Sequence, residues 1–350
     1  MKTEATMRPD PVPATAGQVM MQAIVQRRYG TAPEDVLRLE QIDRPAIKAD
    51  EVLVRVRAAS VDRGTWHLMT GMPYLMRIMG FGLRGPKNPV PGVAVAGTVE
   101  AVGRDVTGLA PGDEVFGTGT GCFAQYATAR ASRLAPKPAG LTFDQAAAVP
   151  VSANTALQAI RDHAKVRPGQ HVLVIGASGG VGTFAVQIAK AFGAEVTGVS
   201  STAKTDLVRA VGADHVIDYT REDPVAGTHR YDAIIDIGGN RRLAELRRAL
   251  APKGTLVITG GEDGDRWLGG IGRNIRAQLL SLFVSQKLTA FVARLRPADL
   301  MTLRDLAGSG AITPAIDRTY PLGQAAVAVR HLAEGRARGK VVISCEDRGN

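Results

Sequence analysis

The hydrophobic pattern divides the chain into two parts with different rhythms. Between Met20 and about Ala135, short apolar runs alternate with Gly and Pro; the runs are QAIVQ, EVLVRVRAA, VAVAGTVEAV, GDEVFG and FAQYATA. Runs of this length, bounded by turn residues, are typical of strands. The first part is therefore predicted to be mainly β.

From about Pro150 the pattern changes to apolar strands separated by helices. The expected strands are HVLVI (171–175), VTGVS (196–200), HVIDY (215–219), AIIDI (233–237), TLVIT (255–259) and LTAFVA (288–293). After the first strand, Phe184, Ala185 and Ile188 recur at helical spacing and form one apolar face. This alternation predicts an α/β fold with a parallel sheet covered on both faces. The last forty residues return to strand, helix, strand, and the pattern leaves open which part they complete.

Composition adds limits on size and partners. A chain of 350 residues exceeds the roughly 250 to 300 residues that one core usually serves, so two domains are expected. The net charge of +10 is compatible with nucleic acid, an acidic membrane surface or anionic small molecules. Because no run of five or more Lys or Arg occurs, we expect a small-molecule substrate and no nucleic-acid partner.

Cysteine usage and the N-terminus indicate the compartment. Cys122 and Cys345 are far apart and form no CxxC pair, which excludes a disulfide framework and a structural zinc cluster. Residues 1–19 are polar and contain proline, without the apolar core of a signal peptide, and no run of about 18 apolar residues follows. We expect a mobile tail over 1–19, no membrane span and a cytoplasmic location.

The stretch VIGASGGVG, residues 174–182, allows three interpretations. GASGG fits the nucleophile elbow GxSxG and would make Ser178 the attacking serine of a hydrolase. AlaSerGlyGlyValGly resembles the dinucleotide turn GxGxxG, with Ala177 in place of the first glycine. A glycine-rich loop could also hold the phosphates of ATP.

The residues around this stretch favour the dinucleotide turn. A P-loop requires a lysine after its last glycine, but Gly182 is followed by Thr183. No HGGG-like loop precedes Ser178, although Asp236 and His331 could be recruited to a triad, so the serine hydrolase stays an alternative. Gly182 has no function in an elbow, whereas in a dinucleotide turn it lets helix and strand approach closely.

The cofactor prediction depends on the end of the second strand, where an acid would bind the ribose of NAD. Ser200 occupies that position, and Lys204 follows closely. The sequence therefore predicts NADPH, with a charge-assisted contact from Lys204 to the 2′-phosphate worth about 1.5 to 3 kcal/mol. The alternative for Lys204 is a solvated lysine at the start of a helix.

Seven segments together resemble the zinc-independent quinone oxidoreductase branch of the medium-chain dehydrogenases/reductases, over about residues 20–345. They are MQAIVQRRYG, EVLVRVRAASVD, PGDEVFG, FDQAAAVPVSANTALQAI, PGQHVLVIGASGGVGTFAVQIAKAFGAEV, GADHVIDY and GKVVI. The resemblance implies a GroES-like β catalytic domain, 20–149 with 310–350, and a Rossmann NADP-binding domain with a doubly wound parallel sheet, 150–309. The nicotinamide would lie between them.

The resemblance also assigns cofactor-binding residues by position. Those expected along the pyrophosphate are Ala177, Ser178, Gly179, Gly180 and Val181. Those expected around the 2′-phosphate are Ser200, Ser201, Lys204 and Tyr219. Those expected along the adenosine and nicotinamide are Thr155, Gly238, Asn240, Thr259, Gly260 and Gly261.

At the positions where zinc-dependent relatives carry metal ligands, this chain has Asp62, GlyValAla (92–94) and about Val151, and the cysteine loop is absent. No metal is therefore expected. Without a Lewis acid, acceptors that are already electrophilic, such as quinones and α,β-unsaturated carbonyls, are favoured over simple alcohols.

Asp62 and Tyr74 are the candidate catalytic residues. The resemblance implies an asparagine where this chain has Asp62. Because an ionised Asp donates no hydrogen bond, Asp62 is protonated, bonds to nearby backbone, or does not touch substrate. Tyr74, on the same cleft-facing segment, is the better candidate for a hydrogen-bond donor.

The segment 266–288 departs from shorter quinone reductases. Ile271, Ile275, Leu279 and Leu282 share one helical face, which could serve as a lid, a dimer contact or a membrane-surface helix. We expect a metal-free, NADPH-dependent reductase of quinones or enones. A non-catalytic NADPH-binding regulator is the alternative, because no indispensable catalytic residue can be named. A homodimer through the sheet edge near 288–293 is what the resemblance implies.

Overall fold

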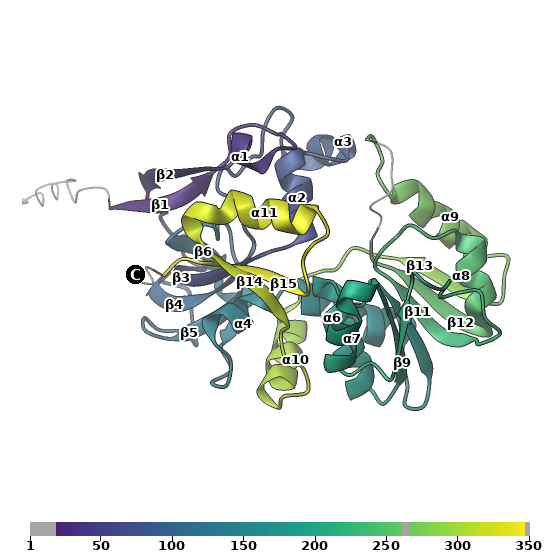
Figure 1. The fold of residues 1–350 in the computed structure, drawn as a ribbon. Helices are drawn as coiled ribbons and strands as arrows, with labels where there is room; N and C mark the ends of the chain where they lie inside the picture. The colour runs from purple at the N-terminus through teal and green to yellow at the C-terminus, as the bar shows by residue number, and fades with distance from the viewer. Residues whose placement is uncertain (1–18, 261–265, 347–350) are drawn as a thin grey trace, which may run out of the picture.

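The computed structural model describes residues 19–260 and 266–346, which form two lobes side by side (Figure 1). Nearly all of the predicted tail, 1–18, lies outside the described residues. The first lobe contains a seven-stranded sheet in the order β14-β15-β3-β4-β5-β7, with β6 paired to β3. Its strands are β3 (Glu51–Val61), β4 (Ala94–Val102), β5 (Glu114–Thr118), β6 (Tyr126–Arg130), β7 (Leu134–Pro136), β14 (Ile316–Pro321) and β15 (Lys340–Ser344).

Shorter elements cover this sheet. An antiparallel pair, β1 (Met20–Val25) and β2 (Arg38–Asp43), lies beside it. The helices of this lobe are α1 (Pro33–Val36), α2 (Arg63–Thr70), α3 (Tyr74–Met76), α4 (Phe143–Ala148) and α11 (Ala325–Ala333). Its single turns of 3-10 or π type are η1 (Arg77–Phe81), η2 (Ala131–Arg133) and η5 (Leu322–Gln324). The last forty residues thus add β14, α11 and β15 to the lobe that begins at the N-terminus.

The second lobe is built on a parallel sheet of six strands in the order β10-β9-β8-β11-β12-β13. The strands are β8 (His171–Ile175), β9 (Glu195–Ser200), β10 (His215–Asp218), β11 (Tyr231–Asp236), β12 (Leu250–Ile258) and β13 (Lys287–Ala290). The first strand, β8, lies in the middle of the sheet, and β9 and β10 follow it toward one edge. The chain then returns to the middle at β11, and β12 and β13 follow toward the other edge. The strand order therefore reverses between β8 and β11, where open α/β sheets bind ligands.

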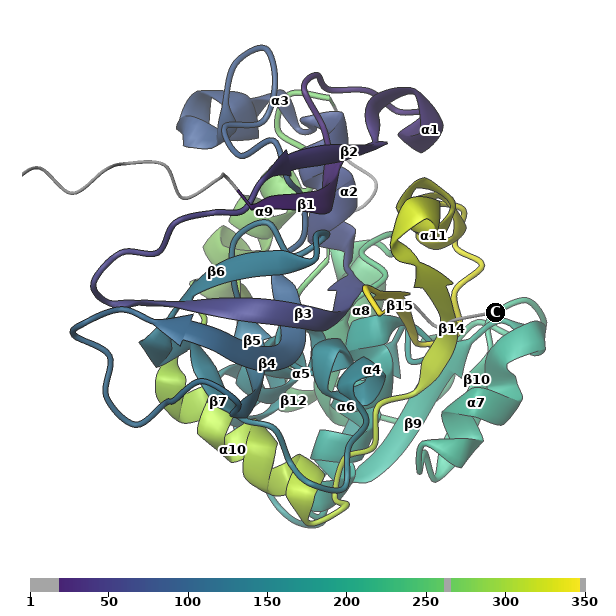
Figure 2. The same ribbon diagram turned by 90° about the vertical axis from the view of Figure 1, so that its left-hand side faces the viewer.

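Helices lie on both faces of this sheet, as Figure 2 shows for α6 and α8. The helices and short turns are α5 (Ser152–Leu157), η3 (Gln158–Ala164), α6 (Gly180–Ala191), η4 (Thr202–Lys204), α7 (Thr205–Ala210), α8 (Leu243–Ala249), α9 (Ile271–Ser281) and α10 (Pro297–Gly308). The predicted apolar face of α6 is buried: Phe184 and Ile188 are fully inaccessible. Each contributes about 1.5 to 3 kcal/mol relative to an exposed side chain. The GroES-like and Rossmann architecture predicted from the sequence is confirmed.

The helix in the segment 266–288 forms as predicted, but its apolar face points outward. Ile275, Leu279 and Leu282 are exposed, and Ala277 is the residue of α9 that is buried. Within the described residues, no helix has both the length and the apolar character needed to cross a bilayer.

Candidate cofactor and active site

The carboxyl ends of β8, β11 and β12 converge where the strand order reverses. A Cβ atom on Gly176, the residue after β8, would lie 3.4 Å from the backbone nitrogen of Gly238. A Cβ atom on Gly260 would lie only 2.0 Å from the carbonyl oxygen of Ile237. The predicted residues Gly238 and Gly260 therefore lie at one edge of the sheet, and at Gly260 the backbone of Ile237 leaves no space for a side chain.

The N-terminus of α6 is packed tightly against the turn that follows β8. A Cβ atom on Gly182 would lie 2.1 Å from the carbonyl oxygen of Gly176 and 2.7 Å from Cα of Ala177. Gly179 occupies the cap position, and no side chain accepts a hydrogen bond from the first turn. Free amide groups and the helix dipole make such an end favourable for an anion.

Two buried hydroxyl groups at strand ends lack partners. Ser200 ends β9 and Thr259 follows β12, and the Oγ atoms of both have no hydrogen-bond partner among the described residues. Buried polar groups are almost always satisfied in native proteins, by protein atoms or by bound molecules. Together with the glycine edge and the open end of α6, these hydroxyls fit a bound dinucleotide.

The region predicted for the 2′-phosphate contains both supporting and opposing features. Tyr219 is exposed after β10, and its backbone nitrogen donates to the carbonyl oxygen of Ser200 at 3.1 Å. The ammonium group of Lys204 donates instead to the carbonyl oxygens of Gly335 and Ala337, at 2.7 and 2.8 Å. Burial lowers the pKa of Lys204 from its usual value. In this structure Lys204 therefore binds the loop before β15.

An acidic residue that the sequence prediction missed also lies in this region. Asp218 is the last residue of β10, and its carboxylate accepts hydrogen bonds from the hydroxyls of Thr202 and Thr220. The bond from Thr202, more than any other contact, lowers the pKa of Asp218. The prediction considered only the end of β9. The register between β9 and β10 places Asp218 opposite Ser200. Without that register, the sequence does not show that Asp218 belongs to this region.

Asp62 lies in a buried cluster with two residues that sequence reasoning did not select. It precedes α2, and its carboxylate forms an ion pair with Lys340, the first residue of β15. Ser152 Oγ donates to Asp62 Oδ1 at 3.0 Å, and Lys340 Nζ donates to Ser152 Oγ at 3.1 Å. Lys340 is only 2% exposed. A charged residue at the start of an otherwise apolar strand was the signal in the sequence.

This cluster contacts the N-terminus of α6. A Cβ atom on Gly180 would lie 3.0 Å from Cδ of Lys340 and 3.3 Å from Oγ of Ser152. The sequence left three states open for Asp62, and the structure shows one of them: in a capping box, its side chain accepts from the backbone of Thr65. The ion pair with a buried ammonium is an addition that the sequence did not predict. In that state Asp62 accepts hydrogen bonds and donates none, whereas Lys340 carries protons and positive charge.

Tyr74 lies at a contact between the lobes. Its ring packs edge-on against Trp267, with ring centroids 5.4 Å apart, and its backbone nitrogen donates to the carbonyl oxygen of Arg266 at 2.8 Å. The described residues show no hydrogen bond between Tyr74 and the Asp62 cluster. The donor function of Tyr74 stays a prediction.

The remaining predicted residues occupy less informative positions. Thr155, in α5, donates through its hydroxyl to the carbonyl oxygen of Val151, the residue before this helix, at 3.0 Å. Ser201 precedes η4, Val181 is half-buried in the first turn of α6, and Asn240 follows β11. Gly261 lies outside the described residues.

No residue in the described part of the chain completes a triad with Ser178. The carbonyl oxygen of Ser178 accepts from Gly339 at 2.9 Å. Of the two residues that the hydrolase alternative could recruit, His331 is paired with Asp317 and Asp236 with Arg273. Neither is engaged with Ser178.

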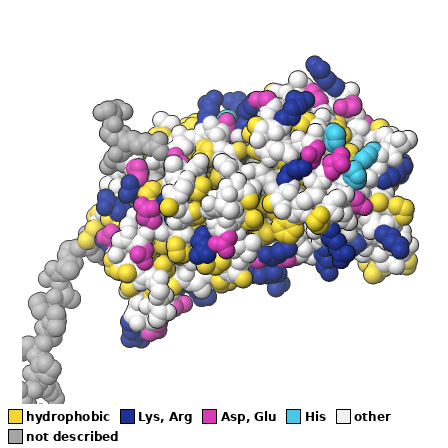
Figure 3. Space-filling view, turned by 90° about the horizontal axis from the view of Figure 1, so that it is seen from below, with side chains coloured by type: hydrophobic (Ala, Val, Ile, Leu, Met, Phe, Trp, Pro, Cys, Tyr) yellow, Lys and Arg dark blue, Asp and Glu magenta, His cyan; other side chains and the backbone are white. Residues whose placement is uncertain are grey.

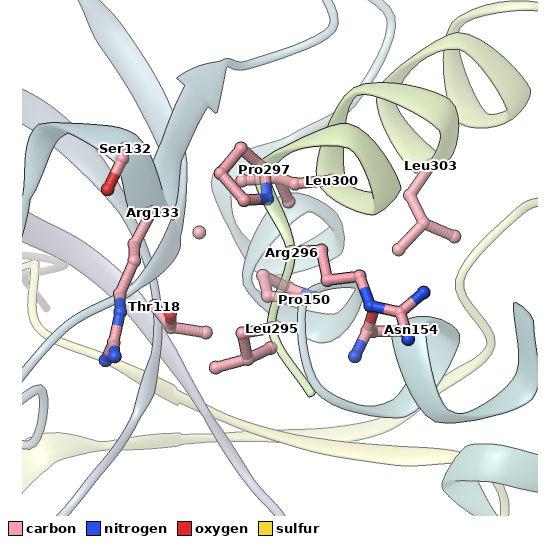
Figure 4. Close-up of a pocket in the computed structure, with 11 residues that line it drawn as sticks. Thr118, Ser132, Arg133, Pro150, Asn154, Leu295, Arg296, Pro297, Leu300 and Leu303 are labelled. Carbon is pink, nitrogen blue, oxygen red and sulfur yellow. The ribbon is translucent and has the colours of Figure 1, made fainter. Parts of the chain in front are cut away.

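Figure 4 shows a small pocket near the start of α5, where Pro150 and Asn154 are among the residues that line it. It is formed between β5, η2 and the start of α10, and Arg133, Leu295, Pro297 and Leu300 are among the residues that line it. It contains none of the predicted site residues. Among the residues that the structure describes, no three His, Cys, Asp or Glu side chains gather in a way that could hold a metal.

Two family models match the chain: an alcohol dehydrogenase GroES-like domain over residues 48–139 and a zinc-binding dehydrogenase over 211–343. The chain is 32% identical over 339 residues to a 2-methylene-furan-3-one reductase from Solanum lycopersicum, covering 92% of this chain and 79% of that protein. It is also 32% identical to the mitochondrial NAD(P)H oxidoreductase RTN4IP1 of Mus musculus, covering 94% of this chain and 90% of that one. The chain belongs to the medium-chain dehydrogenase/reductase family, quinone oxidoreductase-like. It is an oxidoreductase, and the family inferred from its sequence motifs is confirmed.

A solved member of this family has the same architecture. The quinone oxidoreductase from Coxiella burnetii superposes with a TM-score of 0.82 at 27% identity, covering 94% of this chain and all of that chain. The family fold also occurs within much larger proteins. The chain matches 13% of the length of a spectinabilin polyketide synthase system protein from Streptomyces orinoci, at 35% identity over 303 residues and 84% of this chain.

Proposed function

We propose that this protein is an NADPH-dependent oxidoreductase that reduces quinones or α,β-unsaturated carbonyls without a metal. The observation that carries the proposal is the open end of α6, with the unpartnered hydroxyls of Ser200 and Thr259 on one side and the Asp62–Lys340 pair on the other. The similarity to a 2-methylene-furan-3-one reductase supports the acceptor class.

Each part of the chain has a function in this proposal. NADPH, when bound, supplies the hydride. The first turn of α6 would hold the pyrophosphate through backbone amides. The absence of a side chain at Gly180 and Gly182 lets this turn pack closely against Lys340 and against the turn after β8. Lys340 adds a fixed positive charge beside that turn, and Asp62 and Ser152 hold it in place.

The residues at the metal-ligand positions favour chemistry without a metal. Asp62 is already paired with Lys340, and neither the Gly-Val-Ala at 92–94 nor Val151 offers a side-chain ligand. A carbonyl acceptor would thus not be polarised by a Lewis acid, so the acceptor must be activated by its own conjugation. What the protein supplies is orientation of the two reactants and exclusion of water.

The test is to mix the purified protein with NADPH and follow absorbance of the reduced cofactor while adding quinones, enals or simple aldehydes. We expect oxidation with quinones or enals, none with simple aldehydes, and no effect of a chelator. Tight NADPH binding without oxidation by any acceptor would identify the protein as a cofactor-binding regulator. Activity that a chelator abolishes would contradict the metal-free mechanism.

The preference for NADPH can be tested separately at Lys204. Replacing Lys204 by alanine is expected to raise the KM for NADPH about ten- to a hundredfold and to leave the KM for NADH nearly unchanged, because the charge-assisted contact to the 2′-phosphate is lost. The measurement is steady-state kinetics with both cofactors.

Arg338 provides a matched control for this substitution. It belongs to the same loop and holds it against α7 through an ion pair with Asp206, but it is not a predicted phosphate ligand. Arg338→Ala should change both KM values equally. If Lys204→Ala does the same, Lys204 is only a loop contact, and Asp218 has to be considered as the residue that sets cofactor choice.

A further inference from the structure

Large apolar side chains are exposed in two segments that flank the contact between the lobes. In the first segment, η1 and the loop after it, they are Ile78, Met79, Phe81 and Leu83. In the second segment, from the turn before α9 to the residues after it, they are Trp267, Leu268, Ile275, Leu279, Leu282 and Phe283. Several are largely free of contacts: Leu83 is 71% exposed and Phe283 is 83% exposed. Exposed apolar groups in such number usually mark an interaction site.

The two segments meet at one end, beside α3. The backbone nitrogens of Tyr74 and Leu75 donate to the carbonyl oxygens of Arg266 and Trp267, at 2.8 and 3.2 Å. Figures 1 and 2 both show α3 beside the loop that leads to α9. We call this surface, residues 77–87 with 266–283, the apolar rim. It extends across both lobes.

The charges on the apolar rim are of one sign. The sequence contains no Asp or Glu from residue 64 to 99, and none from 266 to 298; Glu262, Asp263 and Asp265, just before the second stretch, lie outside the described residues. Arg84, Lys87 and Arg276 are exposed and have no ion-pair partner in the part of the chain that the structure describes. The face seen from below in Figure 3 is different, because acidic and basic side chains are mixed across it.

We propose that the apolar rim binds the anionic surface of a lipid bilayer. Ile275, Leu279 and Leu282 are spaced so that they form an outward stripe on α9, and Arg276 lies beside it. A helix with an exposed apolar face and basic flanks is suited to lie in the headgroup region, with its apolar side chains in the acyl boundary. The basic residues then meet anionic headgroups, and each contributes about fivefold to binding.

A second copy of this chain is a poorer occupant. A two-fold contact would place the same surface against itself, so basic side chains would approach basic side chains with no acid from the described rim to pair with them. The sheet edge at β13, through which the resemblance implied a dimer, lies against α9, since Gln278 of α9 donates to the carbonyl oxygen of Ala290 at 3.3 Å. The mass of each variant in solution is therefore measured together with its binding to vesicles. Membrane binding through the rim does not depend on the proposed activity.

The experiment is sedimentation of the full-length protein with vesicles of phosphatidylcholine alone or of phosphatidylcholine mixed with phosphatidylglycerol. We expect binding to the mixed vesicles at least tenfold tighter than to the neutral ones, weakening as salt is raised above about 0.1 M. The triple variant Arg84→Gln/Lys87→Gln/Arg276→Gln should bind the mixed vesicles about a hundredfold more weakly. The triple variant Leu279→Ser/Leu282→Ser/Phe283→Ser should bind neither kind detectably.

Controls come from α10, which lies on the opposite side of the molecule from α3 in Figure 1. Met301→Ser/Arg304→Gln changes an exposed apolar residue and a basic residue there, and it should bind vesicles as the unmodified protein does. Circular dichroism establishes that each variant is folded. Light scattering measures the mass of each variant in solution. The proposal is overturned if the unmodified protein binds no vesicles, if the α10 control weakens binding as much as the rim variants, or if the rim variants bind vesicles unchanged while their mass falls to that of a monomer.

Discussion

Replacing Lys340 by methionine is expected to lower the free energy of unfolding by about 3 to 5 kcal/mol, because Asp62 would then be a buried charge without a partner. The Asp62 side chain is 10% exposed and that of Lys340 2%, so solvent provides little screening. The same substitution removes the positive charge beside the first turn of α6. We therefore also expect the Kd for NADPH to rise about ten- to a hundredfold. Denaturant unfolding and a cofactor titration measure the two effects.

The double variant Asp62→Asn/Lys340→Met separates the structural effect from the binding effect. It removes both charges and leaves an amide that can still accept the hydrogen bond from Ser152. We expect most of the stability to return, because no unpaired charge remains, while the affinity for NADPH stays low. If affinity recovers together with stability, Lys340 only holds the lobes together and does not contribute charge to the cofactor site.

Gly182→Ala is the second substitution expected to have a large effect. Helix propensity alone would make alanine more stable than glycine here by about 1 kcal/mol. The added Cβ atom, however, would lie 2.1 Å from the carbonyl oxygen of Gly176, which belongs to the backbone and cannot move aside without shifting the turn. We expect a loss of about 1 to 3 kcal/mol in stability and a rise of roughly a hundredfold in the Kd for NADPH, because the amides of α6 would be displaced.

Gly179→Ala is the matched control for the packing argument. Its Cβ atom would have only the carbonyl oxygen of Gly176 nearby, at 3.5 Å, and the backbone of Gly179 is in the extended region that any residue adopts. The Tm of Gly179→Ala should therefore stay close to that of the unmodified protein. A Gly182→Ala protein that is more stable than its parent and binds NADPH normally would show that α6 and the strand do not need this close approach.

The strands and helices of the second lobe could be predicted from the sequence because each is a short apolar run or a helical face bounded by turn residues. Periodicity could not show which way a face points. For α9 it indicated the stripe of Ile275 and Leu279, but only the fold shows that the stripe is exposed. The sequence also does not show which charged residues lie near the predicted 2′-phosphate site. Asp218 is near it only because the register of β10 against β9 places it opposite Ser200.

The contacts within the cluster around Asp62 could not be predicted from the sequence, for a different reason. Its members come from α2, α5 and β15, and 278 positions separate Asp62 from Lys340. No short sequence motif contains two of these residues. Taken alone, Asp62 is compatible with a helix cap, Ser152 with the start of a helix and Lys340 with the start of a strand. The motif containing Lys340 was noticed as part of a resemblance, but its partner could be identified only from the fold.

The pairing of β15 with β3 also has a consequence for how the protein is made. Val341 of β15 pairs with Val61 of β3. One edge of β3 therefore stays unpaired until β15, which is synthesised about 280 residues later, is available. During synthesis on the ribosome, the whole second lobe emerges before β15, and domains generally fold as units when they emerge. The second lobe can therefore complete its folding first. Until β15 has emerged, the nascent first lobe has an unpaired β3 edge and an Asp62 without its lysine, and such edges are prone to aggregation unless chaperones cover them.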